Sequence, residues 1–246
     1  MYYDLHTHHF LEGNGDICSI VNVPVGDVCE FLPLPPPKGD RLTHDDFASK
    51  SGASYPPLEG AGGGNYSIGI HTWYIEKENI EKELDLIEKY AASPNVKAIG
   101  ECGLDKLCET DFELQKKVFL SHISISEKVK KPLIIHCVKS FDEMVFFKKK
   151  SNPTQAWIIH GFRGKPQQAK QLIEQGFYLS FGLHYNEQSL QNIPIERIFF
   201  ETDDSDCDIR TIYENAAKTL NISEKNLIRQ IEENINSCFL LNTQGE

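Results

Sequence analysis

The sequence predicts an α/β fold of the (β/α)8 barrel class. The chain has 246 residues, close to the roughly 250 residues that this barrel usually needs. From residue 67 onward, short apolar runs alternate with amphipathic helical patterns, the signature of repeated β-α units and a parallel sheet. Eight such runs can be found, the number that a closed barrel requires. We therefore expect a single domain over residues 1–246, distorted around a long loop after the second strand.

The expected strands are short apolar stretches, several of which end on a histidine or an acidic residue. They cover Tyr2–His6, Ile17–Val23, Ser67–His71, Val96–Glu101, Pro132–His136, Ala156–His160, Phe177–Phe181 and Ile198–Thr202.

The segments between the later strands have apolar residues at helical spacing, which predicts outer helices. The repeats are Ile80, Leu84, Ile87 and Ala91; Phe112, Phe119, Ile123 and Val129; Ile212, Ala216 and Leu220; and Leu227, Ile231, Ile235 and Phe239. A further helix over Gln167–Glu174 is followed by Gly176, a residue suited to ending a helix.

Residues 24–66 break this alternation. Prolines at 33 and 35–37 and glycines at 60 and 62–64 punctuate a segment with little periodicity, where a regular barrel would have a helix. Two explanations stay open: a mobile lid over the functional site, or a surface excursion without a role. In both cases we expect this segment to be the most mobile part of the chain.

Composition restricts the class of protein. The chain has 36 acidic and 25 basic residues, a net charge of −11, whereas nucleic-acid-binding proteins usually carry a basic surface. Its seven cysteines are scattered without a Cys-x-x-Cys pair, which argues against a disulfide framework or a zinc clip. The first residues lack the features of a secretory signal, and no apolar stretch is long enough to cross a membrane. We expect a cytoplasmic monomer without membrane association.

The chemistry is indicated by six ligand-type side chains at strand ends, where the active sites of such barrels lie. They are His6, His8, Glu101, His136, His160 and Asp203. Alternate residues of a strand share a face, so both imidazoles of His-x-His can reach one ion. A single histidine would be weak evidence, but six such residues at strand ends predict a metal centre.

Four imidazoles and two carboxylates suit two divalent ions, zinc, manganese, nickel or magnesium. Two ions about 4 Å apart can hold both the attacking and the leaving oxygen of a phosphoryl transfer. Asp4, Asp105 and Glu201 are candidates for partners that orient the imidazoles. For Asp105, a role as a cap of the following loop is an equal alternative.

Taken in order, the motifs resemble those of the TatD family of amidohydrolase-superfamily enzymes. They are Asp-Leu-His-Thr-His, Gly-Ile-His-Thr-Trp, Ala-Ile-Gly-Glu-Cys-Gly-Leu-Asp, Pro-Leu-Ile-Ile-His, Ile-His-Gly-Phe-Arg-Gly and Glu-Thr-Asp. The resemblance implies that the six residues above are metal ligands, that Glu101 is the bridging carboxylate, and that His71 faces the substrate's phosphate. It also implies metal-dependent deoxyribonuclease activity.

The sequence departs from the family pattern where phosphate recognition is expected. Val138 stands where the family usually has arginine, and it is followed by Lys139. Arg163 replaces a usual serine, and acidic residues 204 and 206 follow the last motif. We predict that Arg163 binds the phosphate, because a guanidinium can contact two oxygens at once. Lys139 is the second candidate, with an equal chance of pointing to solvent. Clusters of lysines on the outer helices are expected to be solvated surface.

Three functions remain open. The first is a deoxyribonuclease or phosphodiesterase that uses a metal-activated water, with Asp203 and Glu101 as catalytic residues and DNA or another phosphodiester as substrate. The alternative is a metal-dependent amidohydrolase that cleaves a small-molecule amide or ester, which the acidic charge favours. The third is a binding protein in which the metals are structural, and the complete ligand set argues against it.

Overall fold

A computed structural model describes residues 1–9, 16–25 and 64–239 of the chain. Eight parallel strands in these residues follow one another in the order of the sequence, from β1 to β8. The sheet is nearly closed, because Thr7 and Asp203 form an isolated bridge between the two edge segments. Asp203 donates its backbone N–H to His6 (2.9 Å) and accepts one from His8 (3.0 Å). The predicted barrel class is confirmed.

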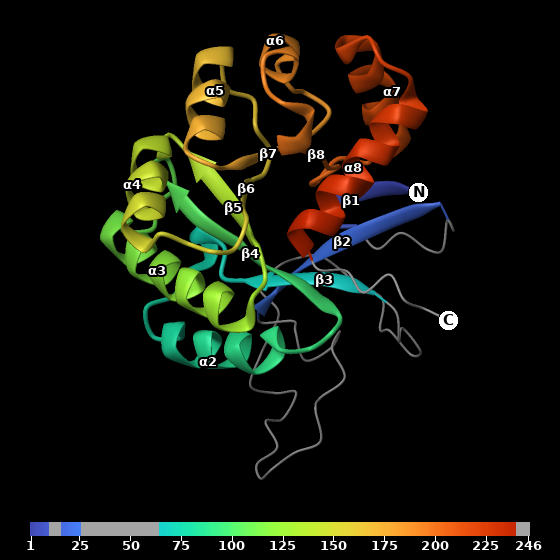
Figure 1. Cartoon of the computed structure of the whole chain (residues 1–246). Coiled ribbons are helices and arrows are strands. Elements are labelled where there is room, and N and C mark those ends of the chain that lie inside the picture. Colours follow the sequence, from blue (N-terminus) through green and yellow to red (C-terminus); the bar gives the residue numbers. More distant parts are fainter. Residues whose placement is uncertain (10–15, 26–63, 240–246) are drawn as a thin grey trace.

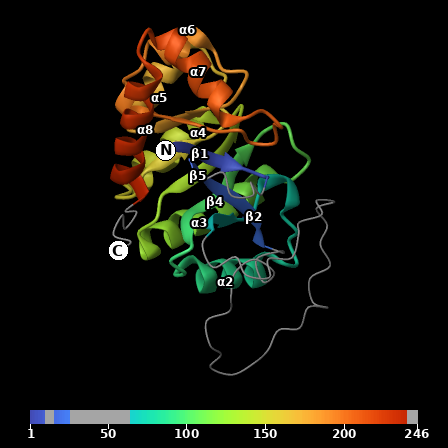
Figure 2. The same ribbon diagram turned by 90° about the vertical axis from the view of Figure 1, so that its right-hand side faces the viewer.

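In Figure 1, helices α2, α3 and α4 lie below and to the left of the strands and α5, α6 and α7 lie above them, with α8 against β1 in both views (Figures 1 and 2). The strands are β1 Tyr2–Thr7, β2 Ile17–Pro24, β3 Asn65–Gly69, β4 Val96–Asp105, β5 Leu133–Val138, β6 Trp157–Ile159, β7 Tyr178–Phe181 and β8 Ile198–Phe200. The helices are α2 Ile80–Ala91, α3 Phe112–Val129, α4 Phe141–Ser151, α5 Pro166–Glu174, α6 Glu187–Gln191, α7 Ile209–Leu220 and α8 Glu224–Phe239, with short 3-10 turns η3 Thr72–Tyr74 and η4 Ile195–Arg197.

All eight predicted strands correspond to observed strands. The prediction that Glu101 ends its strand is wrong, because β4 continues to Asp105. The extension pairs with β5, with Gly103 opposite His136. Gly103 has a φ of 154°, and a side chain there would collide with the backbone of His136, so only glycine allows this close pairing. Glu101 thus lies inside the barrel mouth, beside the strand that bears His136.

The core explains why the strands read as continuous apolar runs. Parallel strands covered by helices are buried on both faces, and residues such as Ile68, Ile99, Ile134 and Phe200 are fully buried. Helices α4 and α6, which we did not predict, also cover this core, with Met144, Phe147 and Leu190 buried. The amphipathic repeats that predicted α2, α3, α7 and α8 supply its outer layer.

Most of the predicted loop over residues 24–66 lies outside the described residues, so the expectation about its mobility remains a prediction. Its ends belong to β2 and β3, which pair directly with each other. None of the helices in the described part of the chain is long and apolar enough to cross a membrane.

Candidate metal centre

The six predicted ligands converge at the carboxyl ends of the strands. His6 belongs to β1 and His8 follows it, Glu101 lies in β4 and His136 in β5, His160 follows β6, and Asp203 follows β8. His71 follows β3 and joins the same cluster. Groups of three among these side chains have donor atoms within 4.8 Å of one another, which suits the coordination of an ion.

Glu101 occupies the middle of the cluster, and its two oxygens face different donors. Oε2 lies 3.3 Å from His6 Nε2 and 3.7 Å from His8 Nε2. Oε1 lies 2.8 Å from His160 Nε2 and 3.0 Å from His136 Nδ1. One carboxylate thus separates two sets of imidazoles, which is the arrangement of a bridging ligand.

Asp203 completes the first of these sets. Its Oδ1 lies 3.7 Å from His6 Nε2 and 3.6 Å from His8 Nε2. Its backbone has a positive φ of 56°, a conformation uncommon outside glycine but more frequent for aspartate. The hydrogen bonds to β1 on both sides hold the residue in this conformation, so its carboxylate is directed by the backbone of the barrel seam.

Asp105 orients the imidazole of His136. Its Oδ2 lies 3.3 Å from His136 Nε2 and accepts a hydrogen bond from the indole N–H of Trp73 (2.9 Å). A carboxylate can only accept, so His136 Nε2 carries the proton and Nδ1 is left with a free lone pair toward Glu101. Oδ1 of Asp105 accepts from the backbone of Leu107 (2.7 Å). Both alternatives considered for Asp105 therefore hold: it orients an imidazole and caps its loop.

Glu201 has the corresponding position behind His160. It is fully buried, and its Oε1 lies 3.5 Å from His160 Nδ1 and accepts a hydrogen bond from the backbone N–H of Gly161. This leaves His160 Nε2 directed at Glu101. Asp4 differs from this pattern, because its carboxylate accepts hydrogen bonds from the backbone N–H (3.0 Å) and hydroxyl (2.7 Å) of Thr202. Asp4 thus fixes the segment that carries Asp203.

His71 has the opposite tautomer from His136. The backbone N–H of Trp73 donates to His71 Nδ1 (3.2 Å), so the neutral ring carries its proton on Nε2. Burial lowers the pKa of His71 despite the neighbouring Glu101, which favours this neutral form. Nε2 lies 3.0 Å from Glu101 Oε1 and acts as a hydrogen-bond donor. A nitrogen that bears a proton cannot coordinate an ion, so the geometry suits contact with an anionic substrate.

The electrostatics of the centre depend on opposite charges held in a buried site. Burial alone would raise the pKa of Glu101, but the surrounding imidazoles, His160 foremost, hold it well below its usual range. Burial opposes a charge on His160, but Glu101 and Glu201 raise its pKa well above the ordinary value. Glu101 is therefore ionised, the state that a ligand requires.

The donor set fits divalent ions. Both ring nitrogens of His6 are buried and have no hydrogen-bond partner among the described residues, although buried polar atoms are normally paired. A bound cation would satisfy Nε2, which faces both carboxylates. Imidazole with carboxylate and without thiolate suits zinc, manganese or nickel, and magnesium to a lesser degree.

A hollow of about 240 Å³ opens beside the centre, and it is lined by Arg163, His184, Glu201, Asp203 and Asp204 among others. Arg163 is exposed and reaches this hollow from the segment after His160. Lys139 follows β5 with a positive φ of 53° and is exposed. It does not line the hollow, so Arg163 is the better placed of the two predicted cations.

Two residues beside His71 were not singled out by the sequence analysis. Trp73 holds Asp105, as described above. His122, fully buried in α3, accepts a hydrogen bond from the backbone N–H of Ile70 (3.0 Å), and its Nδ1 pairs with the carbonyl of Val118 (2.8 Å). It thereby fixes the backbone directly before His71. The helical spacing in α3 indicates that His122 faces the core, but its partner in β3 could not be inferred from the sequence.

The lysine clusters lie in or beside the outer helices, as predicted, but the expectation of solvated surface is wrong for Lys148 and Lys131, which are half-buried. Lys148, near the end of α4, lies over the rings of Trp157 (5.1 Å) and Phe177 (4.8 Å). Trp157 is the first residue of β6, and Phe177 directly precedes β7. Lys131 donates to the carbonyl of Ser93 (2.7 Å). These contacts are at the amino ends of the strands, opposite the metal centre.

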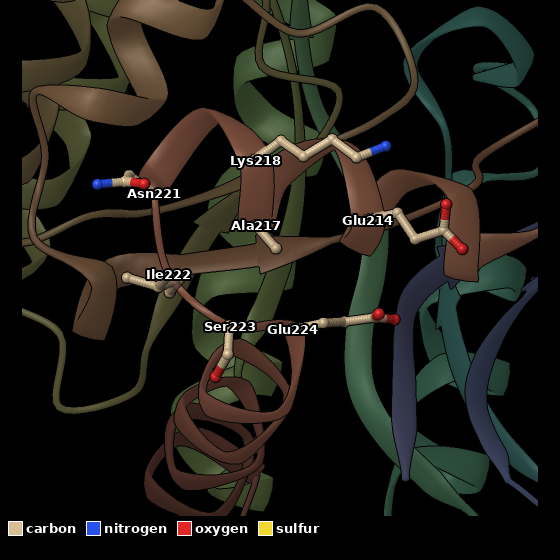
Figure 3. A pocket seen from close by; sticks show the side chains of 7 residues that line it. All are labelled: Glu214, Ala217, Lys218, Asn221, Ile222, Ser223 and Glu224. Atoms are coloured by element: carbon tan, nitrogen blue, oxygen red, sulfur yellow. The ribbon is translucent and has the colours of Figure 1, made fainter.

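A larger hollow of about 500 Å³ lies between the end of α7 and the start of α8 (Figure 3). It includes Lys218, Asn221 and Glu224, and Glu224 accepts a hydrogen bond from the hydroxyl of Tyr2 (2.6 Å). Tyr2 begins β1, so this hollow is at the amino ends of the strands. It contains none of the predicted site residues.

An eight-stranded barrel with imidazoles and carboxylates gathered at the carboxyl ends of its strands has the architecture of a metal-dependent hydrolase. Residues 61–240 match the family model described as TatD related DNase. The chain belongs to this family.

The relatives support this class. An uncharacterized metal-dependent hydrolase of Buchnera aphidicola is 34% identical over 146 residues, which are 56% of this chain and 54% of the relative. The match thus spans about half the length of that relative. Another, from Haemophilus influenzae, is 25% identical over 223 residues, or 83% of this chain and 81% of the relative. The solved TatD homologue YjjV of Escherichia coli K12 has a TM-score of 0.69 at 16% identity, with 98% of each chain covered, and shows the same fold.

Proposed function

We propose that the chain is a deoxyribonuclease or phosphodiesterase that binds two divalent ions. The proposal rests on the position of Glu101 between two pairs of histidines. Its Oε2 faces His6 and His8, and its Oε1 faces His136 and His160. Asp203 adds a carboxylate oxygen to the first set. Each set would hold one ion, with Glu101 as a ligand shared by both sets.

The bound ions would supply Lewis acidity, which lowers the pKa of water and draws electron density from the phosphoryl oxygens. The side chains of the protein perform the other tasks. Asp203 is partly exposed, so its carboxylate can accept a proton from the attacking water. His71 directs its Nε2–H into the cluster, where it can donate to a non-bridging oxygen of the phosphate.

Arg163 provides the cation for substrate binding. It lines the hollow that also contains Asp203, so a phosphodiester that reaches the centre passes within the range of a long guanidinium side chain. Two oxygens of a phosphate can be bound at once by this group. DNA is the substrate that we infer from the family and this geometry.

The test is metal-dependent cleavage of a short single-stranded oligodeoxynucleotide. Protein treated with a chelator and then desalted should have no activity, and the activity should return with manganese or zinc. Elemental analysis should give two ions per wild-type chain and fewer for Glu101→Gln. Glu196→Gln, an exposed acidic residue in η4, is the matched control and should retain both ions and full activity. Cleavage at the original rate by metal-free protein would refute the proposal, as would a failure of the metal-loaded protein to cleave any phosphodiester.

A further inference from the structure

Three large apolar side chains at the mouth of the metal centre are exposed to solvent. Trp73 is 57% exposed, Tyr74 58% and Leu107 71%. We call the two aromatic residues, Trp73 and Tyr74, the aromatic rim. Exposed apolar groups gathered beside a polar site are typical of a ligand-binding surface. All three are close in sequence to residues of the centre. Trp73 and Tyr74 lie two and three positions after His71, and Leu107 lies two positions after Asp105.

The rim is attached rigidly to the centre. The indole N–H of Trp73 donates to Asp105 Oδ2, the oxygen that also faces His136, and the backbone N–H of Leu107 donates to Oδ1 of the same carboxylate. The indole lies 5.0 Å from the ring of His71 and 5.9 Å from that of His136, nearly perpendicular to both. The ring of Tyr74 lies 5.6 Å from His71. Both exposed rings therefore pack against His71, the imidazole that we propose contacts the phosphate, and the indole of Trp73 also packs against the predicted ligand His136.

The net charge of the protein favours a substrate contact that does not depend on basic residues. Affinity for nucleic acid usually comes from lysine and arginine bound to phosphates, but this chain has a net charge of −11. The hollow beside the centre contains Asp203, Asp204 and Glu201 with Arg163. Stacking of bases on aromatic side chains supplies affinity that needs no basic surface, and it tolerates any base because each has a π-face.

We infer that the aromatic rim, and Trp73 above all, stacks against the nucleobase next to the phosphodiester bond that is cleaved. The inference rests on the proposed function and specifies the substrate further: a nucleotide unit with an unpaired base, since a paired and stacked base does not offer its face. It also predicts little preference among the four bases.

The first test measures binding through fluorescence and needs no catalysis. The chain has two tryptophans, Trp73 and Trp157, and Trp157 is fully buried. In Trp157→Phe, Trp73 is the sole reporter. On rapid mixing with metal-loaded protein, before hydrolysis, a short oligothymidylate should quench the emission and protect it from acrylamide. An oligomer of the same length without bases should do neither. If Trp157→Phe does not fold, acrylamide applied to the wild type gives the same information, because it reaches only Trp73.

The second test measures activity. Trp73→Ala and Tyr74→Ala should each raise the ratio of the KM for oligothymidylate to the KM for the abasic oligomer, by about five- to a hundredfold for Trp73→Ala. The ratio isolates the base contact, because loss of the hydrogen bond from Trp73 to Asp105 acts on both substrates. Trp73→Phe removes the indole N–H but keeps a ring, so it should retain most of the preference for the substrate with bases. Phe146→Ala is the control, because Phe146 is equally exposed (57%) but lies in α4.

The outcomes separate the two proposals. If the wild type cleaves both oligomers with equal KM, or if oligothymidylate leaves the emission of Trp73 unchanged, the stacking inference is wrong and the proposed function stands. If the ring of Trp73 is inaccessible to acrylamide in the free protein, the inference is also wrong. If neither oligomer is cleaved by the metal-loaded protein, the proposed function fails together with the inference built on it.

Discussion

Replacement of His122 by glutamine should change how the stability of the protein depends on pH. His122 is fully buried in α3, where its Nδ1 donates to the carbonyl of Val118 and its Nε2 accepts from the backbone N–H of Ile70. Only the neutral ring can make both bonds, because a second proton on Nε2 would face the N–H of Ile70. Glutamine can donate from its amide nitrogen and accept with its oxygen, and it does not titrate.

The magnitude follows from the pKa of His122, which burial lowers from 6.5 to about 4. Between these values the unfolded chain binds more protons than the folded one, so the free energy of unfolding falls as the pH drops from about 6.5 toward 4. At about 1.4 kcal/mol for each pKa unit, the full loss is about 3 kcal/mol, with about 2 kcal/mol reached at pH 5. Above pH 6.5 the contribution is complete and constant.

The assay is urea unfolding of wild type and His122→Gln at several pH values between 5 and 8. Other groups titrate in this range, notably Asp4, whose pKa burial raises to about 7. That carboxyl group favours the folded protein at low pH, the opposite sign to His122. Its effect is the same in both proteins and cancels in the difference. The difference in unfolding free energy should shift toward the variant by about 2 kcal/mol between pH 7.5 and pH 5. A difference that stays constant over this range would refute the reasoning.

Three further predictions concern the centre itself. Glu101→Ala should abolish cleavage of DNA and lower the metal content while the circular dichroism spectrum stays that of the wild type; retained activity would exclude a bridging role. Glu201→Gln removes the charge behind His160, so metal affinity should fall by about 10- to 100-fold in a competition assay with a chelator, and an unchanged affinity would contradict this. Arg163→Ala should lower kcat/KM on DNA by about ten- to a hundredfold with unchanged metal content, and Lys139→Ala should have less effect. Wild-type kinetics in both variants would favour the amidohydrolase alternative.

The barrel could be predicted because its signal is local. Each strand is an apolar run that must be buried on both faces, and its last residues point to one end of the sheet. This is why His6, His136, His160 and Asp203 could be assigned to one cluster before any coordinates were known. The extent of β4 could not be predicted in the same way. Its second half is a strand because Gly103 allows close pairing with His136, a contact between segments far apart in the sequence.

The neighbours of the ligands were harder to predict for a similar reason. Glu201 and Asp105 were expected beside imidazoles, because carboxylates commonly accompany ligating histidines. No comparable general pattern predicts the partners of Trp73 and His122. Trp73 acts through a hydrogen bond to Asp105, 32 positions away, and His122 through one to Ile70, 52 positions away. Residues of these types are found in many cores and surfaces, so only the fold identifies their partners.

The acidic composition, which argued against a nucleic-acid substrate, has a different meaning once the carboxylates are located. Glu101 and Asp203 belong to the predicted ligand set, and Asp105 and Glu201 lie behind the imidazoles of the predicted ligands His136 and His160. These four negative charges would balance the four positive charges of two divalent ions. In the metal-loaded centre that we propose, His71 and Arg163 then face the phosphate without opposition from these carboxylates. If DNA is the substrate, as we propose, the net charge of the protein opposes its approach over long distances, and the local charge at the centre decides whether a phosphodiester can bind.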